Sequence, residues 1–337
     1  MSGASIPYHL RPHKAVDRRI FLDLLGRLER WRPLEKYVYV SMGAYPLEDH
    51  KLMHRILGIT KLIAFDMEGD IVARQKFNKP LGNCHCLERT SGQVVDAFDV
   101  LLTECGFAEA EGAIVWLDYT DPKKLGEQIR EFQTLLANLN VGDVLRVTVN
   151  AQPNELFHSA GEKPQTKEEK REKQFQVLGS RIKDYLPSWA AAAHMTAEDL
   201  PKVIAGSFSA AALKALPATG NNMFRPLSVV RYADGVQMLS ITGTIVERSM
   251  ESDMLARLRL DTWPFASDKW LDIHNLVVPD LTVRERLYLE REIVSKTAED
   301  IVKDLGFEDA SGVKVRDFIE TYKNYYRFYP TLLAAEL

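Results

Sequence analysis

Two acidic side chains, Asp66 and Glu68, follow a predicted strand near the start of the chain. The run YVYVSM (37–42) has the composition of a buried parallel strand, and Gly43 and a helical segment come after it. A second buried run, KLIAF, leads to Asp66, and Glu68 follows closely. In doubly wound α/β sheets, an acid about 20 residues past the first turn hydrogen-bonds the hydroxyls of a ribose. The spacing from Gly43 to Asp66 therefore predicts a ligand that carries a ribose.

The turn after the first strand narrows the choice of ligand. A dinucleotide site needs the pattern G-x-G-x-x-G, whereas the turn SMGAYP contains only Gly43. The next helix begins with Glu48 and Asp49, which would repel phosphates, and the chain has no GxxxxGK[ST] loop. A positively charged adenosyl ligand without phosphates fits better, and S-adenosylmethionine is such a ligand. The alternative is a plain strand–helix–strand unit whose acids only cap helix starts.

Strands and helices alternate over the first half of the chain, which is typical of a mostly parallel sheet with helices on both faces. Asp234-Gly235 separates two β-rich runs and predicts a hairpin, which we place at the antiparallel edge of the sheet. The predicted fold class is therefore α/β, doubly wound. The predicted regions are an N-terminal helical segment (1–35), an α/β domain (36–250) with a helical insert (about 155–222), and a mostly helical C-terminal region (262–337).

Composition and charge indicate an ordinary globular protein. The chain has 337 residues, of which 46% are hydrophobic and 27% charged, and its net charge is −4. This charge gives no general attraction to nucleic acid or to membranes, although the lysines of segment 163–173 could contact a nucleic acid. Three cysteines, no apolar leader and no apolar run of about 18 residues favour the cytoplasm. Cys84-His85-Cys86 lacks the second cluster of a structural zinc site, so we predict no metal.

The order of strands, helices and hairpin resembles the class I S-adenosylmethionine-dependent methyltransferase fold, a seven-stranded sheet whose last strand is antiparallel. The segment AFDMEGDIVARQKFN resembles the second-strand motif of that family, and WLDYTDP resembles its fourth-strand motif. The whole chain, with its opening YHLRPHKAVDR, is also similar to a group of bacterial proteins described as putative O-methyltransferases.

The resemblance implies roles for individual residues. Asp66 would bind the ribose hydroxyls, and Met67 would lie against the adenine. Gly43 would let the backbone approach the methionine half of the cofactor, and Asp118 would lie beside the transferred methyl group. Glu88 is the candidate for the third-strand acid. The complete set of predicted cofactor-binding residues is Ser41, Met42, Gly43, Asp66, Met67, Glu68, Glu88 and Asp118.

Methyl transfer to a hydroxyl group needs a positioned base, which the turn LDYTDP supplies in the form of carboxylates. We predict Asp118 as the first choice, with Tyr119 and Asp121 on the same turn. The alternative is that Asp118 and Asp121 only cap the helix that begins near Lys123.

Departures from the family pattern leave the function partly open. The first motif usually has two or three glycines, and here only Gly43 is present. The fourth motif is neither the (N/D)PP(Y/F) of DNA amino-methyltransferases nor the Pro-Cys of cytosine C5 enzymes. The sequence therefore predicts methyl transfer to the oxygen of an unidentified acceptor. The alternatives are a non-catalytic binding or regulatory protein and a nucleic-acid methyltransferase. An oligomer could form through the hairpin edge or the helical tail.

Overall fold

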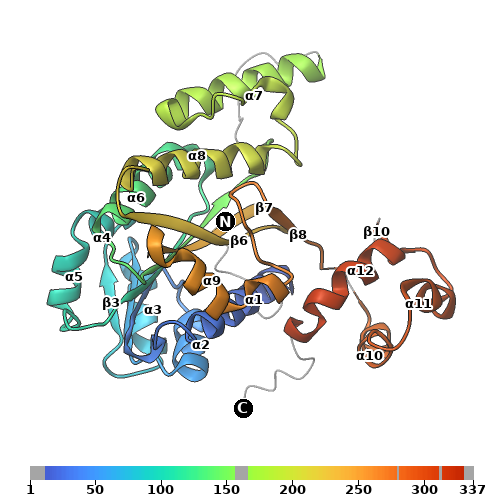
Figure 1. Ribbon diagram of the computed structural model, residues 1–337, viewed down its shortest axis with the longest axis horizontal. Helices are drawn as coiled ribbons and strands as arrows, with labels where there is room; N and C mark the ends of the chain where they lie inside the picture. Colours follow the sequence, from blue (N-terminus) through green and yellow to red (C-terminus); the bar gives the residue numbers. More distant parts are fainter. Residues whose placement is uncertain (1–11, 156–165, 279–280, 311–312, 330–337) are drawn as a thin grey trace. The chain divides into compact units, whose positions relative to one another are not determined.

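A computed structural model describes residues 12–155, 166–278, 281–310 and 313–329 (Figure 1). The chain divides into two compact units. The larger unit, made of residues 22–231 and 235–274, contains every predicted site residue. The smaller unit includes, among the described residues, 12–21, 232–234 and the region from 275 onward. Residues 1–11 of the predicted N-terminal segment and 163–165 of the lysine-rich segment lie outside the described residues. The predicted domain boundaries stay predictions.

Helices and strands follow one another along the chain much as the sequence predicts. The α-helices are α1 (Pro12–Leu28), α2 (Glu48–Leu57), α3 (Gly69–Asn78), α4 (Ser91–Asp96), α5 (Phe98–Glu104), α6 (Leu125–Asn138), α7 (Lys167–Ile182), α8 (Leu200–Ala215), α9 (Glu251–Leu258), α10 (Val283–Glu292), α11 (Ala298–Leu305) and α12 (Val315–Tyr325). The strands are β1 (Val38–Ser41), β2 (Lys61–Asp66), β3 (His85–Glu88), β4 (Ala113–Asp118), β5 (Val144–Asn150), β6 (Asn222–Asp234), β7 (Val236–Glu247), β8 (Ile273–Leu276), β9 (Asp309–Ala310) and β10 (Val313–Lys314).

The main sheet confirms the predicted doubly wound α/β class. Its strand order is β3-β2-β1-β4-β5-β7-β6-β8. The pairs β1–β2, β2–β3, β1–β4 and β4–β5 are parallel, and β5–β7 is antiparallel. From β1 the chain first builds outward through β2 and β3, and then returns to add β4 on the other side. The topological switch point, where such sheets bind their ligands, therefore lies between β1 and β4.

Two details of the predicted sheet are wrong. Among the described residues the sheet has eight strands rather than seven, because β8 lies beyond β6. The hairpin is therefore not the edge of the sheet. The strand β8 was missed because its sequence, IHNL, is short and half polar, and so carries no apolar alternation. The hairpin itself is confirmed, since β6 and β7 flank Gly235, which has a φ of +75°.

Helices cover both faces of the sheet in the larger unit, which is why β1, β4 and β5 read as nearly continuous buried runs (Figure 1). On one face, residues of α4, α5, α6 and α8 form the main hydrophobic core. Phe132 of α6 lies at its centre and packs edge to face against Phe208 and Phe224, with ring centroids 5.0 Å and 5.5 Å away. Helices α2 and α3 pack on the opposite face (Figure 1).

The smaller unit is mostly helical, as the sequence predicts, and adds the short antiparallel pair β9–β10. Its core contains tyrosines from the end of the chain. Tyr322 is buried, and its ring lies 5.3 Å from that of Tyr325 and 5.0 Å from that of Phe318. These aromatic residues therefore pack the unit together. Within the described ranges, no helix is both long and apolar enough to cross a membrane.

Asp143, in the turn before β5, links the neighbouring strands β4 and β7 through hydrogen bonds. Its Oδ1 accepts a hydrogen bond from the amide of Ala113 (2.7 Å), at the start of β4, and its Oδ2 accepts from the amide of Asn140 (2.8 Å). Its backbone carbonyl accepts from the amide of Ile245 in β7 (3.1 Å). Burial raises the pKa of the Asp143 carboxyl to about 6, although the two amide donors oppose the shift.

We expect Asp143 to make the stability of the fold depend on pH. Its pKa is about 6 in the folded protein and about 3.9 in an unfolded chain, so the folded state binds the proton more tightly. The stabilisation is therefore fully present below about pH 4 and is lost as the pH rises through about 6, an effect on the order of 3 kcal/mol. The free energies of unfolding of the wild type and of Asp143→Asn, measured by urea titration from about pH 4 to about pH 7, should show the advantage of the wild type falling. A difference that stays constant with pH would contradict this account.

Candidate functional site

The backbone loop after β1 adopts a conformation that its residues do not favour on their own. Gly43, Ala44 and Leu47 have φ values of +70°, +44° and +54°. For residues other than glycine this left-handed conformation costs about 1–2 kcal/mol each. Gly43 is also needed for space, because a Cβ atom there would lie 2.7 Å from Cε1 of His50 and 2.8 Å from Cδ2 of Leu47. The surroundings of the loop must therefore hold it in place.

Side chains of α3 supply part of that support. Gln75 donates hydrogen bonds from Nε2 to the carbonyls of Met42 (3.0 Å) and Ala44 (3.2 Å). Asn78 donates from Nδ2 to the carbonyl of Tyr45 (3.0 Å). Neither Gln75 nor Asn78 is among the residues predicted from the sequence. Both lie in the segment AFDMEGDIVARQKFN, which resembles the second-strand motif, and their spacing places the two amide side chains on one helix face.

His50 of α2 supports the same loop from within the fold. The side chain is fully buried, and its Nε2 lies 3.0 Å from the carbonyl oxygen of Ile63 in β2. The ring packs edge to face against Tyr39 of β1, with the centroids 4.9 Å apart. Burial lowers the pKa of His50, so the imidazole is neutral and donates from Nε2 to the carbonyl. His50 is thus a structural residue that links α2 to β1 and β2.

Carboxylates gather where β2 and β3 end. Asp66 and Glu88 are register partners, and Oδ1 of Asp66 accepts a hydrogen bond from the amide of Glu68 (2.9 Å) as the chain turns into α3. The Glu88 carboxylate lies against Gly69, the first residue of α3, where a Cβ atom would be 3.1 Å from Oε2. Met67 is 65% exposed on the same turn. The structure thus brings together three predicted carboxylates and one exposed apolar side chain.

Asp118 ends β4 on the sheet face that carries a row of buried polar side chains. Trp116 donates from Nε1 to Oγ1 of Thr148 (3.0 Å), which lies 3.0 Å from Oγ of Ser240. Thr148 is the register partner of Asp118, and Ser41 is the register partner of Trp116. Because strand residues alternate between faces, Asp118, Trp116 and Ser41 share one face of the sheet. The predicted residues at the ends of β1 and β4 therefore lie on the same side.

Tyr119 and Asp121 do not join Asp118. The Tyr119 hydroxyl, on the opposite face, donates to Oε2 of Glu131 in α6 (2.5 Å). Burial raises the pKa of Tyr119 well above its ordinary value, so this hydroxyl stays protonated. Oδ1 of Asp121 accepts from the amide of Lys123 (2.9 Å), which is the capping role that the sequence left open. A catalytic role for these two residues stays a prediction from sequence alone.

The residues of the site suit a nucleoside better than a nucleotide. Glu48 and Asp49 occupy the first turn of α2, where a phosphate would otherwise meet the free amides of a helix N-terminus. Carboxylates can accept hydrogen bonds from ribose hydroxyls and attract a cation. Within the described parts of the chain, no group of three or more His, Cys, Asp and Glu side chains could hold a metal ion.

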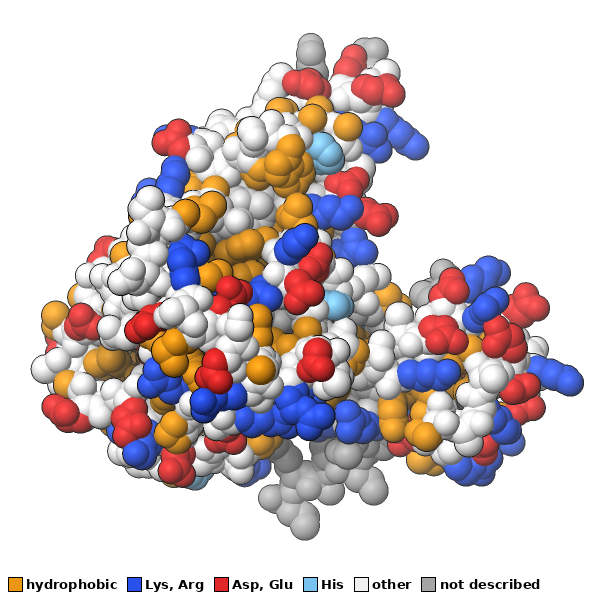
Figure 2. Space-filling view, in the orientation of Figure 1, with side chains coloured by type: hydrophobic (Ala, Val, Ile, Leu, Met, Phe, Trp, Pro, Cys, Tyr) orange, Lys and Arg blue, Asp and Glu red, His pale blue; other side chains and the backbone are white. Residues whose placement is uncertain are grey.

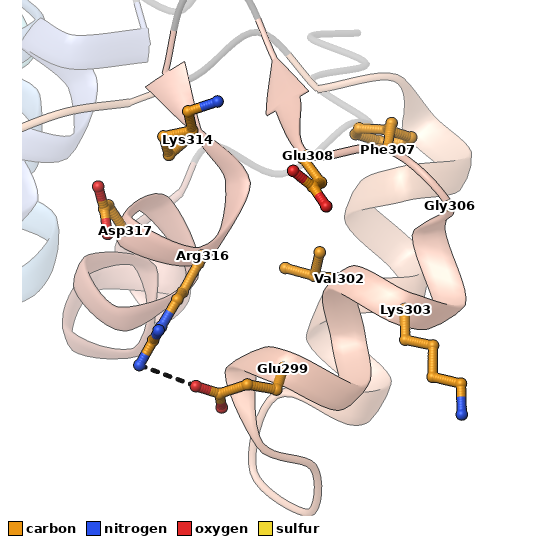
Figure 3. Close-up of a pocket in the computed structure, with 9 residues that line it drawn as sticks. All are labelled: Glu299, Val302, Lys303, Gly306, Phe307, Glu308, Lys314, Arg316 and Asp317. Atoms are coloured by element: carbon orange, nitrogen blue, oxygen red, sulfur yellow. Dashed lines mark ion pairs between the residues drawn. The ribbon is translucent and has the colours of Figure 1, made fainter.

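Two surface cavities lie away from the predicted site. One, of about 290 Å³, is lined by α8, the start of β6 and Trp270, and Figure 2 shows hydrophobic side chains gathered between α8 and β6. The other, of about 640 Å³, belongs to the smaller unit and is lined by α11 and α12 (Figure 3). Across it, Arg316 pairs with Glu299 at 2.9 Å. Neither cavity contains a predicted site residue.

The fold and the candidate site define a doubly wound α/β protein of the kind that binds ligands at the carboxyl ends of its strands. A family model described as "Putative O-methyltransferase" matches residues 6–337. The chain therefore belongs to this family, which confirms the resemblance inferred from its sequence. No curated protein matches the sequence.

A solved structure with some similarity is that of a variant of LepI in complex with SAH and substrate analogue. The two chains are 11% identical and superpose with a TM-score of 0.33, over 62% of this chain and 43% of that one. This chain thus spans less than half of the length of that relative.

Gly43→Ala should destabilise the protein by more than the cost of placing an alanine at a positive φ. We expect a loss of about 2–4 kcal/mol, because the new Cβ atom adds a steric clash with His50 and Leu47 to the cost of the positive φ. Gly106→Ala is the matched control, since Gly106 has a φ of +72° but a Cβ atom there would meet no described atom within 4 Å. Urea unfolding of both variants measures the difference, and equal losses would show that the loop can yield.

Proposed function

We propose that this protein is an S-adenosylmethionine-dependent O-methyltransferase whose cofactor lies across the carboxyl ends of β1 and β2. The observation that carries the proposal is the topology of the sheet. It sets the Gly43 loop, the Asp66–Glu88 pair and Asp118 at one edge, around the switch point. Membership of the O-methyltransferase family supports the reaction class.

The residues at this edge fit the cofactor. The Asp66 carboxylate, oriented through its Oδ1 by the Glu68 amide, would accept hydrogen bonds from the ribose hydroxyls. The exposed Met67 side chain would cover the adenine ring. The backbone at Gly43, where no Cβ atom fits, would approach the amino-acid half. When bound, S-adenosylmethionine supplies an electrophilic methyl group on a sulfonium, and the carboxylates of Asp66, Glu68 and Glu88 favour its positive charge.

Asp118 is the residue we assign to the acceptor. A carboxylate at the end of β4 can take the proton from an acceptor hydroxyl, which makes the oxygen a better nucleophile. The buried row of Trp116, Thr148 and Ser240 fixes the surface beside it, because their hydrogen bonds satisfy one another. Tyr119 has no part in this proposal, because it is bonded to Glu131 on the other face.

The acceptor we propose is a hydroxyl compound rather than a nucleic acid. The net charge of −4 gives no general attraction to a phosphate backbone. A reducing cytoplasm is the proposed compartment, because the three cysteines suit a chain without disulfides.

Asp66→Ala should weaken cofactor binding. A hydrogen-bonded charged group contributes about 1.5–3 kcal/mol, so we expect the Kd for S-adenosylmethionine to rise at least about tenfold. Calorimetric titration with S-adenosylmethionine and S-adenosylhomocysteine measures this. Asp253→Ala is the control, since Asp253 lies on α9 and pairs with Arg257 at the surface (2.8 Å). Absence of binding by the wild type would overturn the proposed function.

Asp118→Asn should separate binding from chemistry. We expect S-adenosylhomocysteine to bind the variant within about twofold of the wild type, while kcat falls by about 10²–10⁴, the usual contribution of a general base. Transfer of a labelled methyl group to a hydroxyl acceptor, found by screening with the wild type, gives the rate. Asp96→Asn, at the exposed end of α4, serves as the control. An unchanged kcat would exclude Asp118 as the base.

A further inference from the structure

We infer that Gln75 and Asn78 are positioning residues that shape the loop Met42–Tyr45 to recognise the amino-acid half of the cofactor. This inference rests on the proposed function. In the proposed function, the adenosine half and the amino-acid half of the ligand occupy different parts of the site. Asp66 and Met67 hold the first, and the loop held by α3 holds the second.

The loop depends on α3 for its shape. Gly43 and Ala44 both have positive φ values, and for Ala44 this conformation has a steric cost. The carbonyls on either side of this strained pair, those of Met42 and Ala44, accept their hydrogen bonds from the single amide of Gln75. Removing that donor leaves two carbonyls without this partner, so the loop would relax toward ordinary backbone angles.

Tyr45 is fixed by the same helix. Its carbonyl accepts a hydrogen bond from Asn78 at 3.0 Å, and the guanidinium of Arg74 lies 3.5 Å from the centroid of its ring. One short segment of α3, little more than a helical turn, carries Arg74, Gln75 and Asn78. It therefore holds both the backbone carbonyls of the loop and the ring of Tyr45.

Burial keeps the Gln75 side chain against the loop. Gln75 is completely buried, and its Oε1 has no hydrogen-bond partner among the described residues. Its Nε2, by contrast, donates to both carbonyls of the loop, so the donor side of the amide is the part of Gln75 that acts on the loop.

The geometry of α3 separates the two halves of the site. The helix begins at Gly69, directly after the Asp66–Glu68 turn, and carries Gln75 and Asn78 in its second half. Asp66 would therefore contact the ribose of the ligand directly, whereas Gln75 and Asn78 would act on the ligand through the loop. Loss of Gln75 should weaken ligands that have the amino-acid half and spare those that lack it.

The test compares two ligands. S-adenosylhomocysteine contains the amino-acid half, and 5′-methylthioadenosine lacks it. For Gln75→Glu, which keeps the shape but replaces the donor amide by an acceptor, calorimetry should show the Kd for S-adenosylhomocysteine rising at least about tenfold and that for 5′-methylthioadenosine staying within about twofold. Asp66→Ala should weaken both ligands. Gln174→Glu is the matched control, because Gln174 is also buried and also donates to a backbone carbonyl, that of Pro153 (2.9 Å).

The outcomes separate this inference from the proposed function. A wild type that binds neither ligand would overturn the proposed function, and this inference with it. A wild type that binds both, with Gln75→Glu weakening both equally or neither, would overturn the inference alone. Circular dichroism establishes that each variant is folded. If Gln75→Glu does not fold, Asn78→Asp decides, because it removes one donor at the less buried end. Selective loss of S-adenosylhomocysteine affinity by several-fold supports the inference, and no selective loss overturns it.

Discussion

The parallel pairing of β1 with β2 on one side and with β4 on the other is the constraint on which the candidate site depends. All four residues of β1 are buried, so a shift of one residue in its register would move every side chain of the strand to the other face of the sheet. Since parallel strands end at the same edge, this pairing alone puts the Gly43 loop between Asp66 and Asp118. Two of the helices then hold the loops at that edge by hydrogen bonds. Helix α3 does this for the loop after β1, and α6 does it for the turn after β4, through Glu131 and Gln128.

The electrostatics of the edge follow from the same arrangement. Asp66, Glu68 and Glu88 lie around the first turn of α3, where the aligned peptide dipoles favour negative charge. The helix thus stabilises a group of carboxylates that would otherwise repel one another. Glu48 and Asp49 occupy the corresponding place in the first turn of α2. Both helices next to β2 in the chain therefore begin with carboxylates, and a positively charged ligand suits these carboxyl ends of the strands.

The parts of this site that depend on local pattern could be predicted from the sequence. The β-branched and aromatic runs of β1, β2 and β4 are strong signals, and the acid at the end of a strand is fixed by the strand itself. The strand β8 was missed, because four residues with polar side chains among them resemble a loop. Gln75 and Asn78 were missed for a different reason. Their partners are backbone carbonyls more than thirty residues away, and no local pattern shows which carbonyls a loop will present.

Asp118 and Tyr119 are adjacent in the chain but lie on opposite faces of the sheet. At the end of β4, Asp118 lies on the side of the buried polar row and Tyr119 in the helical layer, where its hydroxyl donates to Glu131. A single inserted or deleted residue in β4 would exchange the two side chains, so the carboxylate would enter the core and the phenol would take its place. The carboxylate of the candidate site and the anchoring of α6 would then be lost together. The length of this strand is therefore as tightly constrained as the identity of any residue in it.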